Sequence, residues 1–167
     1  MSDEAVGVPG GGAAARGIEI RTATLDDLAA VAPLFAAYRE FYGRPYDLDI
    51  ARQFLADRIR NGESVVLLAS DRAGGRDAAG FAQLYPTFSS VSAAPRWVLN
   101  DLFVAPAGRR RGVARALMRQ AEVEARRAGA VGLSLSTAVD NTSAQALYRS
   151  EGYGLDTAFQ HYDKPLT

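Results

Sequence analysis

Hydrophobic and polar residues along the chain follow two periods, one typical of strands and one typical of helices. Six stretches show strand patterns: residues 18–22, 64–70, 80–88, 97–104, 132–137 and 159–164. In them, apolar residues alternate with polar ones or form short continuous runs. The segment DRAGGRDA, rich in turn residues, separates the second strand from the third and predicts an antiparallel hairpin. The fourth strand follows a soft loop, so we expect three consecutive antiparallel strands.

Four longer stretches have apolar residues at helical spacing: residues 25–42, 49–61, 112–128 and 142–152. Thr24 is the expected N-cap of the first helix, and Pro33 is expected to kink it. Gly129 ends the third helix. Thr142 and Gln145 have the spacing of a capping box, which supports a start of the fourth helix near Thr142.

The order of these elements is β, α, α, β, β, β, α, β, α, β, which predicts an α+β fold. We expect an α/β/α sandwich with a mixed, mostly antiparallel central sheet and helices on both faces. One helix joins the strands at 97–104 and 132–137, and a right-handed crossover would make these two strands parallel. Ligands bind where such strands separate at their C-terminal ends. The segment after residue 104 is therefore expected to lie at the mouth of a site.

The first residues differ in composition from the rest of the chain. Residues 1–17, MSDEAVGVPGGGAAARG, are small and contain few large apolar side chains. Such a segment buries too little surface to fold. We therefore expect a flexible tail at 1–17, followed by a single domain at 18–167.

The composition excludes several kinds of chemistry. The 167 residues contain no cysteine and a single histidine, His161, which removes thiolate zinc sites, histidine metal clusters and cysteine nucleophiles. Nineteen basic and 19 acidic side chains balance, which disfavours general binding to nucleic acid or to a membrane surface. No apolar run approaches the ~20 residues of a membrane helix. We expect a cytoplasmic protein whose chemistry uses hydroxyls, carboxylates, backbone amides or a cofactor.

The basic loop in APAGRRRGVARA is unusual for its position. Arg109, Arg110 and Arg111 precede a helix that opens near Gly112, where the helix dipole disfavours cations. A strand end, a turn and a helix N-terminus in succession have the geometry of a pyrophosphate cradle, and small residues at Gly112 and Ala114 would let a ligand approach the backbone. A bound diphosphate would make the arginines favourable. Solvated surface arginines are the alternative.

Two motifs resemble the GCN5-related N-acetyltransferase (GNAT) family, whose members bind acetyl-CoA. Arg109-x-x-Gly112-x-Ala114 matches the signature Q/R-x-x-G-x-G/A, and DNTSAQALYRSEGY is similar to the later segment N-x-x-A-x-x-x-Y-x-x-x-G-[FY]. Together the resemblance covers residues 99–153, and the order of elements fits the same fold. It implies an acetyl-CoA-dependent N-acetyltransferase that acts on a primary amine by direct attack in a ternary complex.

The resemblance also implies roles for individual residues. The backbone of the strand end would pair with the pantetheine arm as an added strand, and loop amides would hold the pyrophosphate. Tyr148, two helical turns after Asn141, would face the sulfur and protonate the leaving thiolate. On the residues alone, Tyr148 packed in the core is the alternative. The implied cofactor-binding residues are Leu102, Phe103, Val104, Arg109, Arg110, Arg111, Gly112, Val113, Ala114, Arg115, Asn141 and Ala144.

Asp101 is the second candidate catalytic residue. An amine with a pKa of ~10.4 is almost fully protonated near neutral pH, so a group must accept its proton. Asp101 would accept it or hold the amine by charge; pairing with the backbone or an arginine is the alternative. Asn100 stands where relatives that acetylate polyamines often show Glu, which weakens the case for a dicationic substrate. Aromatic residues that would wall the acceptor site, or pack in the core, are Tyr38, Phe41, Tyr42, Tyr46, Tyr85 and Trp97.

The sequence leaves the acceptor and two other functional hypotheses open. A small-molecule amine, an amino acid or diamine, and a protein lysine all remain as acceptors. The main alternative to the enzyme is a non-catalytic acyl-CoA-binding regulatory domain. A nucleic-acid module that uses the arginines is disfavoured by the neutral charge. The resemblance also suggests a homodimer, a common state in the family.

Overall fold

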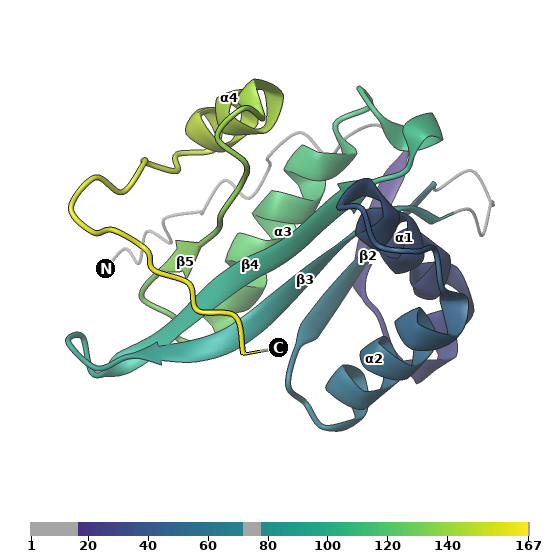
Figure 1. Ribbon diagram of the computed structural model, residues 1–167, viewed down its shortest axis with the longest axis horizontal. Helices are drawn as coiled ribbons and strands as arrows, with labels where there is room; N and C mark the ends of the chain where they lie inside the picture. Colours follow the sequence, from purple (N-terminus) through teal and green to yellow (C-terminus); the bar gives the residue numbers. More distant parts are fainter. Residues whose placement is uncertain (1–16, 72–77, 167) are drawn as a thin grey trace, which may run out of the picture. The chain divides into compact units, whose positions relative to one another are not determined.

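The computed structural model describes residues 17–71 and 78–166 (Figure 1). The chain divides into two compact units, residues 1–135 and 136–167, and each is described by itself. The tail expected at 1–17 lies outside the described residues except for Gly17.

A five-stranded sheet forms the centre of the first unit. Its order follows the sequence: β1 (Ile18–Thr22), β2 (Val65–Asp71), β3 (Ala78–Ser89), β4 (Ala94–Val104) and β5 (Leu133–Ser134). The first four strands pair antiparallel, and β5 pairs parallel with β4. The mixed, mostly antiparallel sheet, the hairpin and the parallel crossover are therefore confirmed.

Helices cover both faces of this sheet (Figure 1). On one face lie α1 (Leu28–Phe41), which follows the short 3-10 turn η1 (Leu25–Asp27), and α2 (Leu48–Arg60). On the other face lies α3 (Val113–Arg127), which a second 3-10 turn, η2 (Pro106–Gly108), separates from β4. The helix of the second unit is α4 (Thr142–Ser150).

The alternation of side chains along the strands explains these two layers. Val66, Leu68 and Phe81 are buried against α1 and α2 in one core cluster. Leu67 and Ala82, which pair across β2 and β3, point to the opposite face because successive side chains alternate. There α3 packs its own buried residues, among them Leu117, Met118 and Ala121. The sheet is thus apolar on both faces, as a sandwich requires.

Two expected strands differ from the structure. The strand expected at 132–137 is reduced to Leu133–Ser134. The strand expected at 159–164 is wrong, because Phe159–Lys164 has no regular structure and every residue from Gly154 to Leu166 is exposed. Alternation alone does not make a strand, since its hydrogen bonds must come from a neighbouring strand.

An ion pair joins β1 to the start of the helical layer. Arg21 donates to both carboxylate oxygens of Asp27, one of them at 2.6 Å, and the backbone N–H of Thr24 donates to Asp27 Oδ2 at 2.9 Å. Thr24 is confirmed as the N-cap residue, although of η1 rather than of a longer helix. Led by the Arg21 hydrogen bond, these contacts lower the pKa of Asp27 from 3.8 to about 2.

We predict that Asp27 contributes to stability above pH 4 and that this contribution is lost as the pH falls from about 4 to about 2. The sign follows from the lowered pKa, because the unfolded chain binds the proton first. Asp27→Asn should therefore lower the denaturant midpoint at pH 6 and have almost no effect near pH 2. Asp26→Asn, at an exposed position in the same turn, is the control. Equal effects of Asp27→Asn at both pH values would contradict the prediction.

Candidate cofactor and active site

One edge of β4 is open over its C-terminal half. β5 pairs with β4 only at Trp97↔Leu133 and Val98↔Ser134. Within the described ranges no strand pairs with this edge from Leu99 to Val104, whereas β3 pairs with the other edge as far as Val104. Backbone N–H and C=O groups on an open edge are available to an extended ligand. The residues predicted for the pantetheine arm, Leu102, Phe103 and Val104, lie on this edge.

A β-bulge interrupts β4 at the same place. Gln83 pairs with Asp101, but the next residue of β3, Leu84, pairs with Leu99. Asn100 is therefore the extra residue of the bulge. Bulges bend a strand and change the direction of its side chains, which suits the point where β4 leaves β5.

The loop after β4 is fixed to β3. Ala105 donates its backbone N–H to Ala79 O at 2.9 Å, and Gly108 donates to Ala105 O at 2.8 Å. Gly108 packs so closely that a Cβ atom there would lie 2.8 Å from Ala79 O. The loop that carries the arginines therefore begins from a rigid base.

The arginine loop ends in an unusual backbone conformation. Arg110 and Gly112 both have positive φ values, 62° and 82°. Gly112 is the N-cap residue of α3 and provides no side-chain cap. The first amides of α3, those of Val113, Ala114 and Arg115, thus point out of the helix end without intrahelical acceptors. Such a helix start and its left-handed neighbours form a site that suits an anion.

Two of the three arginines, Arg109 and Arg111, make different side-chain contacts. Arg109 donates from Nε to Val104 O at 3.3 Å, within its own strand-loop segment. Arg111 forms an ion pair with Asp71, at the end of β2, with Nη2 2.7 Å from Oδ2. A bound diphosphate is therefore not the only partner available to this cluster, because a carboxylate of the chain already neutralises one of the three cations.

Asp101 is buried, with 4% of its surface exposed. Asn100 donates from Nδ2 to its carboxylate at 3.0 Å, and the hydroxyl of Tyr38, on α1, donates a second hydrogen bond. Burial raises the pKa of Asp101 from 3.8, and these two hydrogen bonds oppose the rise. A carboxylate with a raised pKa is a better proton acceptor near neutral pH. In the described residues, the hydrogen bonds to Asp101 come from Tyr38 and Asn100 rather than from the arginine considered as an alternative above.

Polar side chains form a cluster beside Asp101, and two of them, Gln83 and Ser64, were not predicted from the sequence. Gln83, fully buried, donates from Nε2 to Ser64 Oγ at 2.9 Å, while its Oε1 atom accepts no hydrogen bond from the described residues. Tyr85, two residues further along β3, has its pKa raised to about 12 by burial first and then by the charge of Asp101. The sequence feature that could have indicated this cluster is the amide side chain of Gln83 in the otherwise apolar run GFAQLY.

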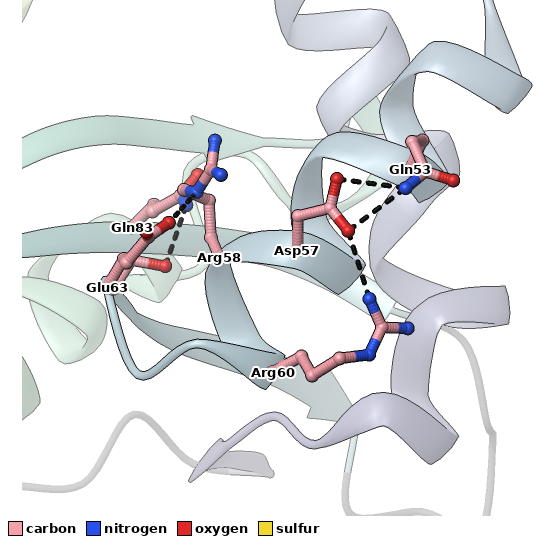
Figure 2. A network of polar contacts seen from close by, with 7 residues as sticks. Gln53, Asp57, Arg58, Arg60, Glu63 and Gln83 are labelled. Atoms are coloured by element: carbon pink, nitrogen blue, oxygen red, sulfur yellow. Dashed lines mark hydrogen bonds and ion pairs between the residues drawn. The ribbon is translucent and has the colours of Figure 1, made fainter.

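Figure 2 shows Gln83 together with two groups of polar contacts made by side chains of α2, one at Arg58 and one at Asp57. Arg58 pairs with Glu63, next to Ser64 in the sequence, and influences the pKa of Tyr85 together with it. Asp57 accepts from Gln53 at 2.9 Å and from Arg60 at 3.0 Å. Of these two networks, the pair of Arg58 and Glu63 is therefore the one whose charges affect the pKa of Tyr85.

Aromatic rings extend from β4 to the surface. Tyr38 contacts Phe103 at 6.3 Å and Tyr42 at 5.1 Å between ring centroids, and Tyr42 contacts Phe41 at 5.2 Å. Phe41 and Tyr42 are exposed to 65% and 55%. Trp97, in contrast, is buried at 7% exposure, which places it in the core.

The second unit contains the later motif. α4 starts at Thr142 as expected, but its N-cap is Asn141, whose Oδ1 accepts from Ala144 N at 3.2 Å. The capping box expected for Thr142 and Gln145 is wrong, because Gln145 donates to the carbonyl oxygens of residues 138 and 139 instead. The ring of Tyr148 lies 6.2 Å from that of Tyr153.

The described residues show no group of three acidic or histidine side chains that could hold a metal ion. None of the helices in residues 17–71 and 78–166 is both long and apolar enough to cross a membrane. The features that make up the candidate site are the open edge of β4, the start of α3 and the buried carboxylate of Asp101.

Comparisons with known proteins identify the family of this chain. The chain is 46% identical over 145 residues to an uncharacterized N-acetyltransferase of Bacillus subtilis, covering 87% of this chain and 95% of the relative. It is 37% identical over 78 residues to an aminoglycoside N(6')-acetyltransferase of Acinetobacter haemolyticus, covering 47% and 54%. The crystal structure of a probable acetyltransferase matches with a TM-score of 0.84 at 44% identity, covering 89% and 98%. Because the model of the acetyltransferase (GNAT) family also matches residues 30–153, the chain belongs to that family and is an acetyltransferase.

Proposed function

We propose that the enzyme transfers an acetyl group from acetyl-CoA to a primary amine by direct attack in a ternary complex. Members of the family generally use acetyl-CoA as the donor. The proposal is supported by one observation. The open edge of β4 leads directly into the fixed loop, and the loop leads to the start of α3, where no side chain of the described residues caps the helix. Acetyl-CoA has matching groups in the same order: the amides of its pantetheine arm can pair with the strand edge, and its diphosphate can bind at the helix start.

Each part of the donor has proposed partners in the chain. Leu102, Phe103 and Val104 offer backbone groups to the pantetheine arm. In the later motif, Asn141 is proposed for the pantetheine end by the resemblance, and Ala144 is proposed as a further cofactor-binding residue. The diphosphate is assigned to the backbone amides of Arg109, Arg110, Arg111, Gly112, Val113, Ala114 and Arg115.

The proposed reaction forms a bond between the amine nitrogen and the acetyl carbon and breaks the bond from that carbon to sulfur. The backbone N–H of Val104 or its neighbour stabilises the negative charge that develops on the carbonyl oxygen. Asp101 takes the proton from the amine directly or through water, or holds the amine by charge. Tyr148 gives a proton to the leaving thiolate.

A screen of amines for thiol release would identify the acceptor class. One similar protein is named for an aminoglycoside substrate, and another, in a solved structure, is named for an alanine of a ribosomal protein. We therefore include aminoglycosides, amino acids, diamines and peptides with a free lysine or N-terminus. We further propose that residues 18–167 act as one catalytic domain, as a homodimer, in the cytoplasm.

Loss of the Tyr148 hydroxyl should slow turnover without weakening donor binding. For Tyr148→Phe we predict about a 100-fold or larger fall in kcat, typical of a lost general acid, and an unchanged stabilisation by acetyl-CoA. Thiol release and thermal unfolding with acetyl-CoA measure the two quantities. Tyr153→Phe, on the neighbouring ring, is the matched control and should keep its activity.

Three outcomes separate the functional alternatives. Stabilisation and thiol release that depend on Tyr148 support the proposal. Stabilisation of the wild type without release for any amine favours an acyl-CoA-binding domain. Absence of any stabilisation by acetyl-CoA contradicts the proposed donor.

A second prediction concerns the pH dependence of kcat/KM. If Asp101 must be ionised, activity falls as the pH drops through its raised pKa. Tyr38→Phe removes a hydrogen bond that favours the charged carboxylate, so the acid limb should move to higher pH. Asp101→Asn should reduce the rate and abolish this limb.

Tyr42→Phe is the control for Tyr38→Phe, because Tyr42, the C-cap residue of the same helix, is in ring contact with Tyr38 and is exposed. Its profile should match the wild type. An unchanged acid limb in Asp101→Asn would assign the limb to another group and contradict the role of Asp101.

A further inference from the structure

Asp71 lies outside both sequence motifs, yet it contacts the arginine loop. It is the last residue of β2, 40 residues before Arg111 in the sequence. The guanidinium of Arg111 donates to its carboxylate at 2.7 Å, and 44% of the Arg111 side chain and 31% of the Asp71 side chain are exposed. The pair is therefore partly covered and bridges two segments that are distant in the chain.

Arg111 lies between two residues with a left-handed backbone conformation. Its neighbours Arg110 and Gly112 have φ values of 62° and 82°. Glycine adopts such values freely, but a side chain as large as that of arginine does so only when surrounding contacts hold it. The end of the loop nearest β4 is fixed through Ala105 and Gly108. The bond to Asp71 fixes the opposite end, just before α3.

We propose that Asp71 is a positioning residue for donor binding. By holding Arg111, it keeps the loop in the conformation in which the backbone amides of residues 109–115 can converge on a diphosphate. This inference rests on the proposed use of acetyl-CoA. In it, Arg111 contributes its backbone amide and its anchoring side chain.

The effect of Asp71→Asn on acetyl-CoA binding distinguishes this role from simple electrostatic repulsion, because the two predict opposite changes in affinity. Asp71 carries a negative charge beside the proposed site of an anionic ligand. If charge alone mattered, Asp71→Asn would remove repulsion and tighten binding of acetyl-CoA. If Asp71 positions the loop, the same substitution loosens the loop and weakens binding.

The test measures the Kd of acetyl-CoA by calorimetry for the wild type, Asp71→Asn, Asp71→Glu and Arg111→Gln. We expect Asp71→Asn to raise Kd about three- to fivefold, the range of a partly exposed ion pair. Asp71→Glu should restore most of the affinity, because it keeps the charge. Asp71→Asn/Arg111→Gln should match Arg111→Gln, since the two residues act through one contact. Glu122→Gln breaks an exposed pair with Arg126 on α3 and should leave Kd unchanged.

A truncated donor provides the readout that a general structural defect would not give. The acetyl thioester of pantetheine lacks the diphosphate, so its kcat/KM should be the same for the wild type and Asp71→Asn. An equal loss with both donors, or an unchanged or lower Kd in Asp71→Asn, would overturn the inference. Thermal unfolding of each variant checks that it is folded. If the wild type itself does not bind acetyl-CoA, the proposed function fails, and this inference fails with it.

Discussion

The early end of the pairing between β4 and β5 is the constraint on which the candidate site depends. The two strands share only the pairs Trp97↔Leu133 and Val98↔Ser134, and no strand in residues 17–71 and 78–166 pairs with that side of β4 from there to Val104. An unpaired strand edge inside a domain normally costs stability or invites aggregation. Here the bulge at Asn100 begins where the pairing ends, so the open edge is built into the strand. A ligand that supplies amide groups can complete this sheet.

The helical layer and the loop give that edge its chemistry. Tyr38, on α1, reaches the buried carboxylate of Asp101 and links the apolar core to a titratable group. The loop fixed at Gly108 and Arg111 leads to the start of α3, where no side chain in the described part of the chain caps the first amides. The donor edge, the proton acceptor and the anion site thus all follow from one strand and its continuation.

The sequence predicted most of this arrangement where local patterns determine structure. The periods of the strands and helices, the antiparallel pairing of β2 with β3 and the parallel pairing of β4 with β5 were predictable from the order of residues. The pattern at 159–164 misled because a strand needs a partner that local alternation does not reveal. The contacts of Asp71 with Arg111 and of Gln83 with Ser64 join residues 40 and 19 positions apart, and no periodicity encodes them. The role of Tyr148 came from the family motif and stays a prediction.

The most direct test of the central claim is hydrogen exchange of individual amides with and without acetyl-CoA. The account predicts that the donor slows exchange at residues 102–104 and 109–115, because these backbone N–H groups would bind the pantetheine arm and the diphosphate. Exchange in α2 should stay unchanged. Binding of acetyl-CoA that leaves both segments unprotected would show that the open edge of β4 and the start of α3 are not the donor site.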